Sequence, residues 1–402
     1  MLLTDRDLLG RLVGFDSTST SSNLPIADFV CEYLDRPGVT IVRQPGPDEA
    51  KVNVIAMAGP QETEGGLLLS GHLDVVPALE SGWDSDPFRL TEVDGTYVGR
   101  GACDMKGSIA LAMNIFAAAD PESLGRPLAL LLTYDEELGS LGAQHFASAW
   151  PDDQPLPGNV VVGEPTSLRA VRMHKGHLWL QAVVQGKAAH SGAPHLGQNA
   201  VEAGARVVTA LSRLAVVFKQ KRSDNSRFFS TVPFAVLNVG RIQGGQAVNV
   251  IPDRCVIDVG VRLMPGMNTS AAIEWVRDVV VKADPQSQLT LTVCNDNPPM
   301  LLEDDAAIHR TLCEHLGQSQ SYGVSFASDA GVLSDLGMEC VLFGPGSIEV
   351  AHKPNEFVPI EELTRCREVL DHLVTTFCEP EERRSETRRA TESHGGPRRE
   401  NN

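Results

Sequence analysis

The chain has 402 residues, 42% of them hydrophobic and 21% charged, which is typical of a globular protein large enough for two domains. Its formal net charge of −18 disfavours nucleic acids and anionic membranes as partners, because both repel an acidic protein. No apolar run approaches the roughly 20 residues that cross a bilayer, and the acidic N-terminal segment does not resemble a signal peptide. Eight scattered cysteines without a C-x-x-C pair favour reduced thiols, so we expect a cytoplasmic protein.

Short apolar segments alternate with helical segments over roughly the first 170 residues. Apolar runs bounded by turn residues predict buried strands at 65–71, 126–134 and 158–164. Helical patterns at 108–120 and 140–150 lie between these strands. Strands that alternate with helices predict an α/β fold with a mostly parallel sheet covered on both faces.

From about residue 175 the pattern becomes a strand, a long helix, two strands, a second helix and a last strand. This βαββαβ order is typical of a ferredoxin-like α+β sandwich. The α/β pattern then resumes, so we predict a discontinuous α/β domain, residues 1–174 and 295–378, interrupted by an inserted domain, residues 175–294. The tail, residues 379–402, is rich in Arg and Glu and almost free of apolar residues, which predicts disorder.

Several ionisable side chains follow the predicted strands, where the functional crevice of an open α/β sheet lies. Each one alone is more often a solvated residue at a strand end, but here five segments deliver compatible groups to one edge. These groups are His72 with Asp74, Asp104, Asp135 to Glu137, Glu164 and His352. Imidazole and carboxylate together form a zinc-type ligand set that cobalt or manganese also accepts.

Charge counting favours two metal ions over one. Asp104, Glu137 and Glu164 bring three negative charges and two divalent ions bring four positive charges, which leaves a slightly positive centre suited to an anionic substrate. Two ions about 3.5–4 Å apart need a bridging carboxylate, and Asp104 in its tight glycine-rich loop can supply it.

Asp74 and one of the two adjacent glutamates could assist the metal ligands without binding metal themselves. Asp74 shares one face of an extended segment with His72 and can therefore orient its imidazole. Adjacent glutamates such as Glu136 and Glu137 point to opposite sides of an extended chain, so one can bind metal while its neighbour acts as a general base.

The chain resembles the M20 metallopeptidase and deacylase family, from the N-terminus to about residue 378. Five segments of the chain are similar, in the same order, to the motifs of that family: SGHLDVVP, GRGACDMKGSIA, TYDEELGSLGA, VVGEPTSL and GPGSIEVAHKPNE. Within the family, three segments of the chain resemble the acetylornithine deacetylases most closely: VGEPTSLRAVRMHKGH, TVPFAVLNVGRIQGG and RLMPGM.

The resemblance implies a catalytic domain of the zinc-dependent exopeptidase type that holds two divalent ions, Zn²⁺ or alternatively Co²⁺. It implies that Asp104 bridges the ions, that Glu136 is the general base and that Asp74 supports His72. One ion would be held by His72, Asp104 and Glu164, and the other by Asp104, Glu137 and His352.

The resemblance also implies that the inserted domain forms a homodimer contact. His190 would then reach the partner subunit's site and stabilise the oxyanion, although from the sequence alone it could be an ordinary surface histidine. The α-carboxylate of the substrate would be held by Asn249, Arg262, Gly346 and Ser347. Arg262 could instead form a salt bridge at a strand end; its planar guanidinium suits bidentate carboxylate binding.

The function implied is removal of the acetyl group from N-acetyl-L-ornithine, a step of arginine biosynthesis, with Asp329 as a candidate for the distal ammonium. The alternatives are a related N-acyl-amino-acid deacylase, such as a succinyl-diaminopimelate desuccinylase, an acetylcitrulline deacetylase or an aminoacylase, and a non-catalytic metal-binding protein. A nucleotide-binding α/β protein is disfavoured, because no G-x-G-x-x-G or Walker pattern follows the first predicted strand.

Overall fold

The computed structural model describes residues 2–60, 65–79, 81–151 and 153–380. It divides into two compact units. The first unit runs to Val171 and also contains Leu302–Gln320 and the chain from Leu336 onward, and the second unit contains Arg172–Leu301 and Ser321–Asp335. Residues 381–402, most of the tail that we expect to be disordered, lie outside the described residues.

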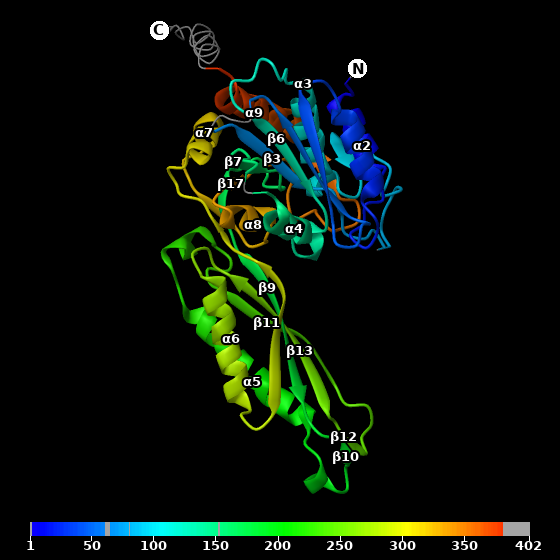
Figure 1. Ribbon diagram of the computed structural model, residues 1–402, viewed down its shortest axis with the longest axis vertical. Coiled ribbons are helices and arrows are strands. Elements are labelled where there is room, and N and C mark those ends of the chain that lie inside the picture. The colour runs from blue at the N-terminus through cyan, green and yellow to red at the C-terminus, as the bar shows by residue number, and fades with distance from the viewer. Residues whose placement is uncertain (1, 61–64, 80, 152, 381–402) are drawn as a thin grey trace. The chain divides into compact units, whose positions relative to one another are not determined.

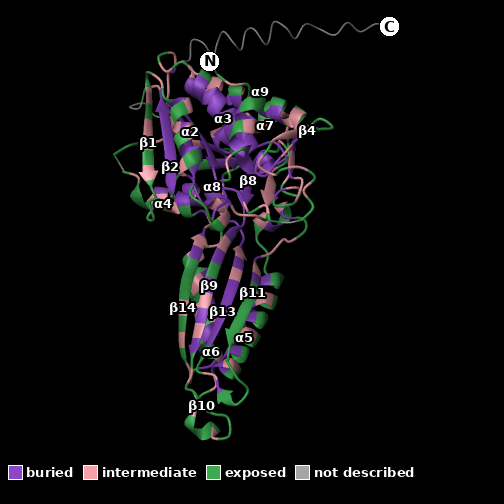
Figure 2. Ribbon diagram, turned by 90° about the vertical axis from the view of Figure 1, so that its right-hand side faces the viewer, coloured by how far each residue is buried: buried purple, intermediate pink, exposed green. Residues whose placement is uncertain are grey.

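The sheet of the first unit has a parallel core and an antiparallel edge (Figure 1). The strands of this sheet that lie wholly in the first unit are, in spatial order, β1 (Val39–Pro45), β2 (Val52–Ala58), β6 (Leu128–Thr133), β3 (Leu67–His72), β7 (Asn159–Val162) and β17 (Glu339–Leu342). The pairs from β6 to β17 are parallel, which confirms the predicted α/β class. Strands β1 and β2 are antiparallel and were not predicted, and Figure 2 shows β2 buried throughout whereas β1 is half-buried or exposed.

Helix α3 (Gly107–Ala118) is the central helix of the first unit. It is hydrophobic on all sides, since it packs against β3 and β6 as well as against neighbouring helices. The other helices of this unit are α1 (Asp5–Val13), α2 (Leu24–Leu34), α4 (Leu141–Ala149), α7 (Ala307–Leu316) and α9 (Ile360–Cys378). A small sheet joins β4 (Thr91–Val93), β5 (Thr96–Val98) and β18 (Phe357–Pro359).

The second unit is a four-stranded antiparallel sheet with two helices packed against it (Figure 1). Its elements follow the predicted βαββαβ order: β9 (Gly176–Gln185), α5 (Ala200–Gln220), β11 (Val236–Gly244), β13 (Arg254–Leu263), α6 (Thr269–Ala283) and β14 (Gln288–Asn297). The spatial order β11-β13-β9-β14 confirms the ferredoxin-like arrangement. Residues of β9 alternate between buried and more exposed positions, because one face of the sheet packs on the helices.

Shorter elements complete the second unit. A two-stranded ribbon extends from the sheet and pairs β10 (Ala189–His190) with β12 (Val250–Ile251). The unit's other strands are β15 (Met300–Leu301), β16 (Tyr322–Val324) and β8 (Val171–His174), whose first residue belongs to the first unit, and its third α-helix is α8 (Asp329–Asp335). Across the described residues of both units, none of the helices has the length and apolarity that a membrane span requires.

Candidate metal centre

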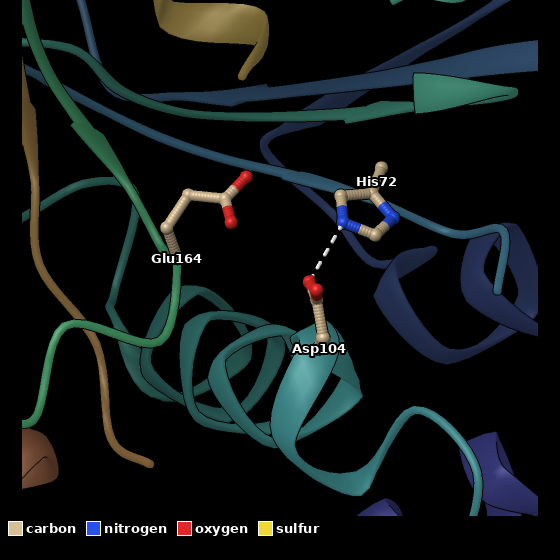
Figure 3. A group of neighbouring side chains, drawn as sticks. All are labelled: His72, Asp104 and Glu164. Atoms are coloured by element: carbon tan, nitrogen blue, oxygen red, sulfur yellow. Dashed lines mark hydrogen bonds and ion pairs between the residues drawn. The ribbon is translucent and has the colours of Figure 1, made fainter. Parts of the chain in front are cut away.

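Three ligand-type side chains of the first unit converge beyond the carboxyl ends of two parallel strands (Figure 3). His72 is the last residue of β3, and Glu164 lies two residues beyond β7. Asp104 comes from the turn that precedes α3 and points at both of them. Their ligand atoms lie within 4.8 Å of one another. All three residues are buried, with exposed fractions of 1% for His72, 3% for Glu164 and 5% for Asp104.

Asp104 also belongs to a second group, with Glu137 and His352. Its Oδ1 lies 3.1 Å from Nε2 of His72, while its Oδ2 lies 3.2 Å from Nε2 of His352. Nε2 of His352 is also 2.8 Å from Oε1 of Glu137. The two oxygens of one carboxylate therefore serve two separate donor groups, which is the arrangement expected of a bridging ligand.

The hydrogen bonds of His72 indicate its tautomer and leave Nε2 as the nitrogen that faces Asp104. Nδ1 lies 2.9 Å from the backbone carbonyl oxygen of Asp74, which can only accept, so Nδ1 carries the proton. In the neutral ring, Nε2 then directs a lone pair at the Asp104 carboxylate, and two acceptors at 3.1 Å attract a cation between them. Burial alone would lower the pKa of His72, yet hydrogen bonds to Asp104 and Asp74 raise it well above its ordinary value.

The second group has the same electrostatic character. Hydrogen bonds to Asp104 and then Glu137 raise the pKa of His352 to about 10. Burial alone would raise the pKa of Asp104, but hydrogen bonds from His352 and His72 lower it below its usual range. Two imidazoles and three carboxylates thus form a mostly buried set of metal ligands that favours bound cations and fits a pair of divalent metal ions.

The carboxylate of Asp74 contacts the loop of the glutamates more closely than it contacts His72. Its Oδ1 lies 3.5 Å from Nδ1 of His72 but 3.0 Å from the backbone nitrogen of Glu136. Its Oδ2 accepts from the backbone N–H of Glu137 at 3.2 Å and from the hydroxyl of Ser19 at 2.7 Å. Asp74 therefore orients His72 chiefly through its backbone carbonyl, while its side chain holds the turn that carries Glu136 and Glu137.

Comparison with known proteins places this centre in a family. The model of peptidase family M20/M25/M40 matches residues 68–376, which is well over half of the chain. An acetylornithine deacetylase of Myxococcus xanthus is 38% identical over 380 residues, covering 93% of this chain and 97% of the relative. The chain belongs to the M20/M25/M40 peptidase family. The predicted membership in the M20 family and the predicted hydrolase class are confirmed.

Two solved M20 structures share the fold. An M20 family metallo-carboxypeptidase from Sulfolobus solfataricus has a TM-score of 0.73 at 17% identity, covering 93% of this chain and 99% of that chain. A Bacillus subtilis M20 peptidase described as dinuclear metal binding has a TM-score of 0.65 at 16% identity, covering 92% of this chain and 96% of that chain. At such identities the likeness concerns the fold, and it agrees with an α/β domain that carries an inserted domain.

Two of the predicted site residues of this M20 chain lie on the ribbon of the second unit. His190 in β10 pairs with Val250 in β12, and the carbonyl of the neighbouring Asn249 accepts from Ser191. The backbone N–H of Gly192 donates to Nδ1 of His190 at 3.0 Å, so in the neutral ring the exposed Nε2 carries the proton. His190 is thereby set up as a hydrogen-bond donor, the role that an oxyanion requires.

Arg262 and Asp329 lie at the other end of the second unit. Arg262 pairs with His177 at the start of β9, whereas the ribbon continues from the opposite end, where Arg254 pairs with Gln185. The eight residue-to-residue steps of extended strand from Arg254 to Arg262 span roughly 26 Å. Asp329 begins α8, which contacts β14 and β15, and is 1% exposed. Within the second unit of one chain, His190 and Asn249 are therefore not brought together with Arg262.

Gly346 and Ser347 lie in the first unit, in the loop between β17 and His352. Gly346 has a φ of +81°, and its N–H donates to Oε2 of Glu362 at 2.7 Å. The hydroxyl of Ser347 accepts from the backbone nitrogen of Glu349 at 3.2 Å. These contacts fix the loop beside the metal centre.

Lys51 and Asp135 form a buried ion pair that the sequence does not predict. The pair anchors Asp135, whose φ of +50° starts the turn that carries Glu136. Nζ of Lys51 also donates to the carbonyl of Ser19 at 2.7 Å. Burial raises the pKa of Asp135 to about 6 despite the hydrogen bond from Lys51. A lysine 84 residues away in sequence gives no local signal of this contact.

Replacing Lys51 with methionine is expected to lower the free energy of unfolding by about 3–5 kcal/mol, because it leaves the buried Asp135 without its ammonium partner. The control is Arg43→Met, which breaks the surface pair with Asp28, whose side chains are 39% and 64% exposed, and which should cost at most about 1 kcal/mol. Urea unfolding measures both, and equal losses would contradict the expectation.

Proposed function

We propose that the chain removes the acetyl group from N-acetyl-L-ornithine, giving L-ornithine and acetate as a step of arginine biosynthesis. The observation that carries the hydrolytic part of the proposal is Asp104, whose two carboxylate oxygens face two separate histidine-containing groups. The acetylornithine part is supported by the 38% identical relative of that name, which spans almost the whole chain.

The proposed ligands are His72, Asp104 and Glu164 for one ion, and Asp104, Glu137 and His352 for the other. Two divalent ions, which we propose to be Zn²⁺ with Co²⁺ as a substitute, would polarise the acyl carbonyl and lower the pKa of a water molecule. The eight cysteines are free in the structure, which supports the further proposal of a cytoplasmic location.

Glu136 is the proposed general base. It follows Asp135 in the turn whose backbone N–H groups are held by Asp74, and its neighbour Glu137 belongs to the second ligand group. Glu136 would take a proton from the attacking water and return it to the nitrogen of the departing amine as the amide C–N bond breaks. The acetyl carbon thereby gains the oxygen that leaves as acetate.

His190 and Asn249 are proposed to act in the site of a partner subunit. Support comes from the roughly 26 Å of β13 that separate Arg254, at the ribbon end, from Arg262. At that separation, Arg262 and the ribbon that contact one small substrate would come from different copies of the chain. In the proposed homodimer Nε2–H of His190 donates to the oxyanion, and Arg262 binds the α-carboxylate. Gly346 and Ser347 would line the carboxylate site and Asp329 would face the distal ammonium.

The test is hydrolysis of a panel of N-acylated amino acids by protein that is first chelated and then reloaded with Zn²⁺ or Co²⁺. N-acetyl-L-ornithine is expected to have the highest kcat/KM, measured as acetate release, and activity should vanish on chelation and return with metal. A clear preference for N-succinyl-diaminopimelate or N-acetylcitrulline would replace the substrate, and no hydrolysis of any compound would favour the binding-protein alternative.

Replacing His190 with alanine is expected to lower kcat by about 10²–10³-fold, the loss that follows removal of one oxyanion donor. The mass of the assembly, measured by light scattering, should not change. The control is His195→Ala, an exposed histidine in the same loop region, which should leave kcat near wild type. An unaltered rate in the His190 variant would return His190 to the class of ordinary surface histidines.

A further inference from the structure

Glu356, the last residue of the GPGSIEVAHKPNE motif, has no place in the chemistry above, yet it is a buried carboxylate with an exposed fraction of 1%. Its Oε1 accepts from the backbone nitrogens of Cys103 at 2.9 Å and Asp104 at 3.0 Å. Its Oε2 accepts from Nη1 of Arg100 at 2.7 Å. A charged acceptor forms stronger hydrogen bonds than a neutral one, so this carboxylate holds the loop of Asp104 firmly.

The loop needs such an acceptor. Asp104 has non-helical backbone angles, φ −122° and ψ 93°, in the turn that leads into α3. The first N–H groups of a helix and of the turn before it have no partner within the helix and must be satisfied from elsewhere. Glu356 satisfies two consecutive N–H groups there, and one of them belongs to the residue whose side chain faces both ligand groups.

The segment that carries Glu356 also carries His352, four residues earlier. Arg100, which is 1% exposed, approaches the carbonyl of Lys353 at 3.5 Å and stacks its guanidinium over Trp83. The backbone carbonyl of Glu356 accepts from Gly99 at 3.0 Å. One short segment therefore supplies His352 and also holds the loop of Asp104, so these two ligands are fixed relative to each other.

We propose that Glu356, held by Arg100, is a positioning residue that sets the distance between Asp104 and His352 and thereby the affinity for the second metal ion. The inference rests on the proposed metal centre but not on the identity of the substrate. Residues that hold metal ligands by hydrogen bonds typically contribute about 10–100-fold to metal affinity. The ion of the Asp104, Glu137 and His352 group should be affected more, because two of its three ligands are tied together.

The experiment titrates Co²⁺ into chelated full-length protein and follows both the visible absorption of the bound cobalt and equilibrium dialysis. Glu356→Gln is expected to bind one of the two cobalt ions, that of the Asp104, Glu137 and His352 group, about 10–100-fold less tightly and to alter its absorption spectrum, with a smaller effect on the other ion. The control is Asp5→Asn, the corresponding change in the ion pair with Arg367, which should titrate like wild type.

A double variant separates positioning from simple destabilisation. Arg100→Met with Glu356→Leu removes both buried charges together, which leaves no unpaired charge and favours folding. Its folding is checked by thermal melting, and its affinity for the second cobalt ion should remain lowered. Wild-type titration by either Glu356 variant would overturn the proposal. If the variants titrate as expected but no acylated amino acid is hydrolysed, the positioning role stands and the proposed substrate falls.

Discussion

Replacing Glu136 with glutamine is expected to lower turnover of N-acetyl-L-ornithine by about 10²–10⁴-fold, the usual contribution of a general base. Glutamine has nearly the same shape but cannot take a proton from water or return one to the amine. Because the backbone N–H of Glu136 rather than its side chain bonds to Asp74, the turn should keep its structure. Metal content, measured by atomic emission, should therefore stay at the wild-type value.

The matched control for Glu136 is Glu349→Gln, an exposed glutamate in the loop that leads to His352. It undergoes the same chemical change near the same centre and should keep its turnover within about twofold. Turnover by the Glu136 variant at the control's rate would remove Glu136 from the base role. A loss of metal alongside activity would instead show that Glu136 helps to bind metal.

Replacing Asp104 with asparagine is expected to abolish activity and to weaken the binding of both metal ions. The amide has one acceptor oxygen and no charge, so it cannot serve His72 and His352 with a carboxylate oxygen each. Glu164→Gln is the informative comparison, since Glu164 belongs to one group only. That variant should lose one ion and retain the other, as measured by metal analysis after dialysis.

Two results would contradict the expected behaviour of the Asp104→Asn variant. If the asparagine variant retains two ions, the bridging role is wrong. If Asp104→Asn and Glu164→Gln each lose a single ion, the two groups bind independently. Circular dichroism should show that both variants are folded, because Asp104 lies in the irregular turn Ala102–Lys106 before α3 and Glu164 lies beyond the end of β7.

The sequence was sufficient to predict the elements with strong periodicity and the groups that follow them. The strands that end near His72, Glu164 and Asp135 were predicted because apolar runs stop abruptly at charged residues. The antiparallel strands β1 and β2 do not follow from the sequence pattern. β2 is buried along its whole length and therefore lacks alternation, and β1 at the sheet edge is amphipathic only in part.

The supporting contacts could not be predicted, since each joins residues distant in sequence. Ser19 donates to Asp74 across 55 residues, and Glu356 accepts from Asp104 across 252 residues. Asp74 illustrates the limit of local reasoning. The H-x-D spacing predicts that the Asp74 carboxylate orients His72. In the fold the backbone carbonyl of Asp74 lies nearer the ring, and the carboxylate holds the Glu136 turn.

Because the ribbon lies far from the Arg262 end of the second unit, the specific activity should depend on the protein concentration. Under the proposed assembly a solitary chain is an incomplete catalyst, whatever its metal content. Specific activity should then fall on dilution below the dissociation constant of the dimer, and a chain with a damaged ribbon would inactivate its neighbour's centre rather than its own. Two chains damaged at different places could consequently restore one working centre between them.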